Sequence, residues 1–261
     1  MNYIKPEFVN GEIYHIYNRG VEKRDIFKDE NDRFRFVFSL YECNDCNTVI
    51  MRDRIFQRKE RNLRQRPTMA QLSNCPMAGY SMHKNSKRKK LVELFAFCLM
   101  PNHYHMIIKQ LVDGGISCFM RKLGDSYVKY FNEKHLRKGM GSLFQGKFKA
   151  RFIRDNDQFV NLVTYIHTNP VGIAEKNWKE NGISDIQIAI DNLNYYRWSS
   201  YSDYIGKPNF PSIINKVFTL KAFAGNENDF EKQGAENIKK FANNWIKHKG
   251  ELFAGLSRAG I

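Results

Sequence analysis

The stretch LVELFAFCLMPNHYHMIIKQ, residues 91–110, decides the fold. Residues 91–100 form a continuous apolar run, and residues 103–109 form a second one. Pro101 and Asn102 between the two runs are typical turn residues. Two apolar runs joined by so short a turn predict a hairpin in the middle of a buried sheet.

Segments on both sides of this hairpin predict the other elements of one domain. Alternation and β-forming residues predict strands over residues 12–18 and 143–153, and apolar spacing predicts helices over residues 30–42, 116–133 and 157–169. Asp29 is placed to cap the first helix, and Asp155 or Asp157 the last, which Asn169-Pro170 ends. The order β-α-β-β-α-β-α predicts an α+β ferredoxin-like sandwich with a central antiparallel sheet and one extra helix.

The composition along the chain suggests how the domain is organised. Residues 44–90 are strongly basic and contain few large apolar residues, so we expect an insertion in a catalytic domain over residues 1–175. The charges of this insertion either follow a phosphate backbone or form an ordinary solvated face. Residues 176–261 hold an aromatic segment and a helical tail, which predict a C-terminal, mostly helical appendage.

The charge of the chain points to a polyanionic partner. A net charge of +15 over 261 residues favours nucleic acid, with simple solubility as the alternative. No apolar run reaches the length of a membrane span, and residues 1–15 lack the apolar region of a signal peptide, so a cytoplasmic protein without membrane contact is expected. Cys43 and Cys46 form a lone CxxC, which falls short of the four ligands of a zinc site.

Four polar residues form a candidate site. His103 and His105 are two apart on a predicted strand, so both imidazoles share one face, as a metal-binding pair would. Tyr165 and Asn169 are one helical turn apart on the predicted helix 157–169. Each residue also has an ordinary structural explanation. If the helix covers the histidine strand, however, a phenol and a carboxamide converge on the same ion.

Several separated motifs along the chain are distinctive: CLMPNHYHMIIKQ (98–110), YIHTNP (165–170), YHIYNRGVEKRDIF (14–27), SLFQGKFKARFI (142–153) and WSSY (198–201). Together they resemble the IS200-like transposase family, and most closely its REP-associated tyrosine transposases. They occur in the order typical of the family and extend over roughly residues 8–205, interrupted by the basic insertion.

The resemblance implies a role for each residue of the candidate site. His103 and His105 match the family's His-hydrophobic-His metal motif, and Tyr165 matches its catalytic tyrosine. Asn169 falls on the third metal ligand, where better-known members have Gln. The implied cofactor is Mg²⁺ or Mn²⁺, and the implied reaction cleaves and rejoins single-stranded or hairpin DNA through a 5′-phosphotyrosine. Family members include both monomers and homodimers.

Alternatives to this interpretation remain open at the level of sequence. Tyr127 and Tyr130 are rival nucleophiles, although their spacing is typical of core residues. A hairpin-binding protein without cleavage activity, a metallonuclease that uses water, and an RNA-binding ferredoxin-like domain are alternative functions. The basic residues that we expect at a DNA interface are Arg19, Lys23, Arg24, Lys147, Lys149 and Arg151.

Overall fold

The computed structural model describes residues 6–51, 53, 88–137, 139–175, 183, 185–225 and 229–248. Most of the predicted insertion, residues 52 and 54–87, lies outside the described residues, as do residues 249–261 of the predicted appendage.

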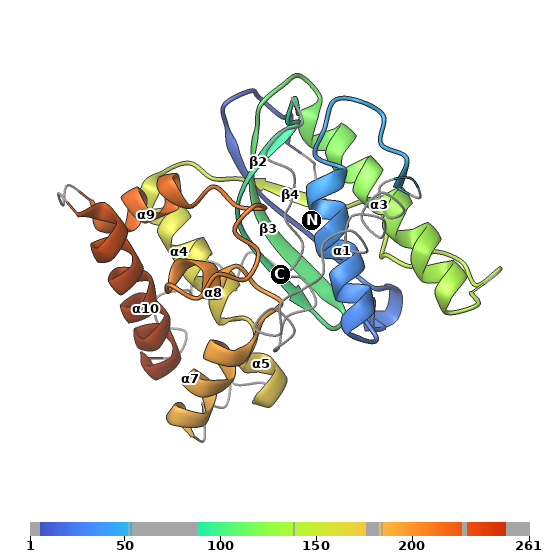
Figure 1. Ribbon diagram of the computed structural model, residues 1–261. Helices are drawn as coiled ribbons and strands as arrows, with labels where there is room; N and C mark the ends of the chain where they lie inside the picture. The colour runs from blue at the N-terminus through green and yellow to red at the C-terminus, as the bar shows by residue number, and fades with distance from the viewer. Residues whose placement is uncertain are drawn as a thin grey trace, which may run out of the picture.

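A four-stranded antiparallel sheet forms the centre of the fold (Figure 1). Its strands are β1 (Ile13–Arg19), β2 (Val92–Met100), β3 (His103–Gln110) and β4 (Lys149–Phe152), in the spatial order β2-β3-β1-β4. With a helix after β1 and another after β3, this is the ferredoxin-like arrangement. The predicted α+β fold class is confirmed.

The β2–β3 hairpin is the predicted one, and its turn is held from the first part of the chain. The backbone N–H groups of Ile26 and Phe27 donate to the carbonyl of Pro101, and that of Gly20 donates to the carbonyl of Asn102. The segment after β1, which includes the short 3-10 helix η1 (Val21–Lys23), therefore lies directly beside the start of β3.

Helices α1 (Glu30–Glu42) and α3 (Gly115–Lys134) cover one face of the sheet, and α4 (Asn156–Thr168) lies on the other (Figure 1). The predicted caps are present, because the side chain of Asp29 accepts from the backbone N–H of Asp32 and that of Asp155 from Gln158. Tyr104 of β3 packs against Phe36 of α1, with ring centroids 5.1 Å apart. Its neighbours on β3, His103 and His105, therefore face α4.

The predicted strand over residues 143–153 is only partly correct. Regular pairing is confined to β4, whereas Phe144 makes an isolated bridge to Gly20. Between them Gly146 has a φ of 82°, and its N–H donates to the carbonyl of Phe144. This turn interrupts the extended backbone, because a positive φ is incompatible with a β-strand.

The C-terminal part of the chain is helical and packs on the same side as α4 (Figure 1). It comprises α5 (Val171–Ala174), α7 (Ile186–Tyr195), α8 (Tyr201–Tyr204), α9 (Lys216–Ala224) and α10 (Phe230–His248). Its irregular segments also follow the outer edge of β2: Leu99 N–H donates to Trp198, Ser200 N–H to Phe97, and Asn215 N–H to Leu94. Among the described residues, no helix is long and apolar enough to cross a membrane.

Candidate active site

The two histidines of β3 share one face with residues of β1. Antiparallel pairing sets Arg19 opposite His103 and Tyr17 opposite His105, and paired residues point to the same side of a sheet. Because side chains alternate along a strand, His15 also lies on this face. The face that carries the predicted metal motif is therefore lined from two strands.

Tyr165 is brought to these histidines by α4. Its ring meets that of His105 edge-on, with centroids 5.6 Å apart and an interplanar angle of 84°. The side chain is 8% exposed, and the helix that carries it is buried along most of its length. The structure thus places the predicted nucleophile beside one of the two predicted metal ligands.

Asn169 is the C-terminal cap of α4 and is buried. Its Nδ2 donates to the backbone carbonyl of Tyr165 at 3.0 Å, which fixes the amide at the end of the helix. Oδ1 is the atom of this side chain that would serve as a ligand.

His103 is oriented by the residue before it. Its Nδ1 lies 2.6 Å from Oδ1 of Asn102, and Nδ2 of Asn102 donates in turn to the carbonyl of Lys23 at 3.1 Å. A carboxamide oxygen only accepts hydrogen bonds, so Nδ1 of His103 carries the proton. Nε2 is consequently the ring nitrogen that has the lone pair required for metal ligation.

His105 is contacted by a third histidine, which the sequence interpretation missed. Nε2 of His15 lies 2.9 Å from Nδ1 of His105, and both rings are buried. Burial, with a further contribution from Arg151, lowers the pKa of His15 to about 3, so this ring is uncharged near neutral pH.

Tyr17 was missed as well, and it stacks on both of these histidines. Its ring lies 4.8 Å from that of His15 and 5.8 Å from that of His105. The alternation of His15 and Tyr17 along the predicted strand 12–18 was the signal that the sequence offered. That alternation does not show which strand lies alongside.

The residues present fit a divalent metal ion. Both histidines of the motif have Nδ1 engaged by a neighbouring side chain, the usual arrangement around histidine ligands, and a carboxamide lies at the end of α4. Within the described part of the chain, no three His, Cys, Asp or Glu side chains are grouped to hold a metal. Further ligands would therefore be oxygens of Asn169, of water or of a phosphate.

The rival tyrosines lie on the other face of the sheet. Tyr127 of α3 contacts Phe27 and Phe36, and its hydroxyl donates to the backbone carbonyl of Ile26. Burial raises the pKa of Tyr127 well above its ordinary value, with a smaller contribution from Asp32. Tyr130 donates to Asp32 at 3.3 Å, and burial raises its pKa too. These phenols belong to the core around α1 and α3.

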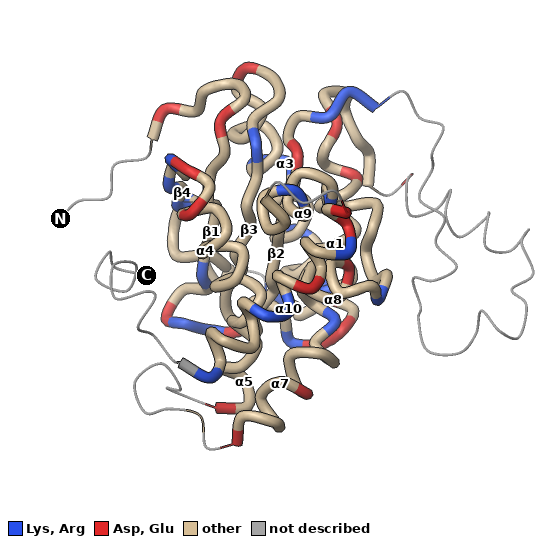
Figure 2. Tube along the Cα trace, turned by 90° about the vertical axis from the view of Figure 1, so that its left-hand side faces the viewer, with Lys and Arg blue, Asp and Glu red and all other residues tan. Residues whose placement is uncertain are grey.

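The predicted basic residues separate into two groups. Lys149 and Arg151 of β4 pair with Tyr17 and His15, so they share the face of the histidines, and Arg19 does so as the partner of His103. Figure 2 shows β4 at the side of the sheet next to β1. The remaining predicted residues lie outside the strands: exposed Lys23 in η1, Arg24 beside Glu22, and exposed Lys147 before β4.

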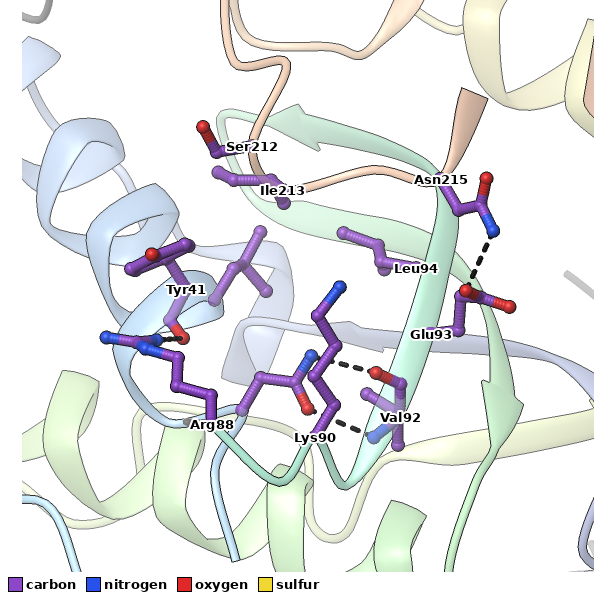
Figure 3. Close-up of a pocket in the computed structure, with 11 residues that line it drawn as sticks. Tyr41, Arg88, Lys90, Val92, Glu93, Leu94, Ser212, Ile213 and Asn215 are labelled. Atoms are coloured by element: carbon purple, nitrogen blue, oxygen red, sulfur yellow. Dashed lines mark hydrogen bonds between the residues drawn. The ribbon is translucent and has the colours of Figure 1, made fainter. Parts of the chain in front are cut away.

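A pocket elsewhere in the molecule has no part in this constellation. It lies at the start of β2, between α1 and the segment before α9, and none of the predicted site residues lines it (Figure 3). Arg88 bridges to Glu42 at 2.7 Å and donates to the carbonyl of Tyr41, while Asn215 donates to Glu93. Val92 at the pocket and Met100 next to His103 are at opposite ends of β2, about 25 Å apart at the rise of a strand.

Comparison with known proteins identifies the segment that holds the site. Residues 73–169 match the model of the family described as transposase IS200 like, and this range contains His103, His105, Tyr165 and Asn169. The chain carries an IS200-like transposase segment. The match supports the expected family over residues 73–169, and this family consists of DNA-processing enzymes.

A comparison with solved structures found one that is similar to this chain. A solved structure described as a REP-associated tyrosine transposase bound to a REP hairpin aligns with 80% of this chain and 90% of its own chain, with 14% sequence identity and a TM-score of 0.43. The comparison with curated proteins gave no match.

Proposed function

We propose that this protein is a transposase that cleaves and rejoins single-stranded DNA through a covalent bond to Tyr165. The observation that carries the proposal is the edge-on contact of Tyr165 with His105, on the face of the sheet that also bears His103. A phenol beside a strand that presents two imidazoles on one face suits a metal-assisted tyrosine nucleophile.

The reaction exchanges one phosphoester for another. The phenol oxygen of Tyr165 attacks the scissile phosphorus and loses its proton, the bond from phosphorus to the 3′ oxygen breaks, and this oxygen takes up a proton. The products are a 5′-phosphotyrosine and a free 3′-OH. Rejoining is the reverse attack by a 3′-OH, and it needs no ATP because the phosphoester is conserved.

The chain's own residues prepare the phosphate and the nucleophile. His103 and His105, with Asn169, would hold a Mg²⁺ or Mn²⁺ ion, which when bound withdraws negative charge from the scissile phosphate. Asn102 and His15 orient the two imidazoles, and the cap at Asn169 fixes the end of α4 that bears Tyr165. Imidazole ligation favours Mn²⁺ more than Mg²⁺, because Mg²⁺ prefers oxygen ligands.

The DNA would lie across the part of this face that belongs to β1 and β4. Lys149, Arg151 and Arg19 are on the same side of the sheet as the histidines, and exposed Lys23 adjoins the hairpin turn that precedes His103. These cations support a phosphate-binding surface around the nucleophile. We propose single-stranded DNA with a hairpin as the substrate, bound by a monomer or a homodimer.

The test compares two phenols that both lie beside His105. Tyr165→Phe and Tyr17→Phe proteins are incubated with a labelled single-stranded hairpin oligonucleotide and Mn²⁺, and adducts that survive SDS are separated by electrophoresis. Tyr165→Phe should form no adduct, whereas Tyr17→Phe should still form one. Adduct formation by Tyr165→Phe would overturn the assignment. Tight hairpin binding by the unaltered chain without cleavage would instead support a DNA-binding protein.

A further inference from the structure

We propose that His15 is a positioning residue that sets the tautomer of His105 when a metal ion binds. This inference rests on the proposed function, because it concerns the metal site of that reaction. It assigns a role to a residue outside the two-histidine motif, on a different strand.

The contact between the two rings is direct and shielded from water. Nε2 of His15 and Nδ1 of His105 are 2.9 Å apart, and each residue is 2% exposed. The rings are nearly parallel, at 20°, with Tyr17 stacked against both. Pairing between β1 and β3 fixes this arrangement, because Tyr17 lies opposite His105 and His15 is two residues earlier on the same face.

The hydrogen bond between Nε2 of His15 and Nδ1 of His105 contains one proton, and this proton has two possible positions. If Nε2 of His15 donates, Nδ1 of His105 accepts, and the proton of His105 must be on its Nε2. That nitrogen then has no lone pair for a metal ion. If Nδ1 of His105 donates instead, its Nε2 is a ligand, and His15 carries its proton on Nδ1.

The two histidines of the motif therefore differ in how they are prepared. His103 is preset, because Oδ1 of Asn102 only accepts a hydrogen bond and holds the ring in the ligating tautomer. His105 has a partner that either donates or accepts. A metal ion can therefore bind Nε2 of His105 only when Nδ1 of His105 donates its proton to Nε2 of His15.

Two substitutions separate this role from simple packing. In His15→Gln the amide oxygen still accepts from Nδ1 of His105, whereas His15→Phe keeps an aromatic ring and removes the acceptor. Mn²⁺ binding to the full chain without DNA is measured by isothermal titration calorimetry, and folding is checked by thermal melting without metal. We expect His15→Phe to bind Mn²⁺ about 10–100-fold more weakly, the usual effect of losing such a partner, and His15→Gln to recover most of the affinity.

The controls distinguish failure of this inference from failure of the proposed function. If Mn²⁺ binding is insensitive to His103→Ala and His105→Ala, the proposed metal site is wrong. If those variants lose binding but His15→Phe, melting as the unaltered chain does, binds Mn²⁺ normally, only the role of His15 is overturned. An equal loss in His15→Gln and His15→Phe would also overturn it.

A second measurement requires no substitution and covers the case in which His15→Phe does not fold. In protein labelled with ¹⁵N-histidine, NMR distinguishes protonated Nδ1 from protonated Nε2, and Zn²⁺ serves as a diamagnetic ion for the imidazole site. On addition of Zn²⁺, His15 should carry its proton on Nδ1. A Zn²⁺-bound state in which His15 keeps the proton on Nε2 would contradict the proposal.

Discussion

Tyr165 of α4 and His105 of β3 meet edge to face, with ring centroids 5.6 Å apart. The contact joins a strand that ends at Gln110 and a helix that begins at Asn156. Because both elements are buried in the core, the phenol and the imidazole keep this relation without any ligand. This contact of the candidate site is therefore present in the protein alone.

Asn169 is expected to affect stability and metal binding in opposite directions when its amide is replaced by a carboxylate. Asn169→Asp loses the N–H that donates to the carbonyl of Tyr165, which should lower the free energy of unfolding by about 1–3 kcal/mol. The same change gives the metal a charged oxygen ligand and should strengthen Mn²⁺ binding. Urea denaturation and calorimetry measure the two effects, and unchanged or weaker Mn²⁺ binding would argue against Asn169 as a ligand.

Lys149 and Arg151 should account for part of the salt dependence of DNA binding. If each neutralises one phosphate of a single strand, the double Lys149→Ala, Arg151→Ala variant should reduce the slope of log K against log salt by about 1.4. Fluorescence anisotropy from 50 to 300 mM salt measures the slope. The matched control is Arg121→Ala with Lys129→Ala, since both residues are exposed on α3, which covers the other face. Equal slopes for the two double variants would contradict the proposed interface.

Ser200 should be more important for stability than its size suggests. Its Oγ lies 2.9 Å from Nε2 of buried His167 and accepts from the backbone N–H of Phe97, so it links α4 to β2. Ser200→Ala leaves both groups without this partner and should cost about 2–4 kcal/mol of unfolding free energy. Exposed Ser212 offers the control, because Ser212→Ala should change stability by less than about 0.5 kcal/mol. Equal urea midpoints for the two variants would exclude the link.

The cysteines should differ sharply in reactivity. Burial raises the pKa of Cys43 to about 11, and burial also raises that of Cys98, whereas Cys46 is exposed. A raised pKa means that little thiolate exists at pH 8, so Cys43 should react slowly and accelerate only as the pH approaches 11. The number of thiols that react quickly with Ellman's reagent at pH 8 is compared with that of the unaltered chain. It should fall by one in Cys46→Ser and stay the same in Cys43→Ser. Loss of the fast equivalent in Cys43→Ser would contradict this order.

Local signals in the sequence were sufficient for most elements of the fold. The apolar runs of residues 91–110 predicted the hairpin, and Asp29 and Asp155 marked the first turns of α1 and α4. The extent of β4 was not predictable in this way. The apolar pattern of residues 143–153 continues through Gly146, but the backbone turns there.

The candidate site was predictable only in part, for a physical reason. Spacing along one element suggested His103 with His105 and Tyr165 with Asn169, and the structure places Tyr165 of the second pair against His105 of the first. The contact of His15 with His105 depends on the register between two strands separated by about ninety residues of chain. The pattern of residues within one strand does not determine how that strand is aligned with its neighbour.

The backbone hydrogen bonds along the outer edge of β2 limit where the chain can be truncated. Residues 198–215 occupy the backbone donors and acceptors of Leu99, Phe97 and Leu94 on the outer side of that strand. A shortened chain that ends before this segment would leave apolar β2 as an open sheet edge, which favours association with further copies and aggregation. The family-matched segment should therefore be produced together with residues 198–215 in one polypeptide, because these residues cover the edge of β2.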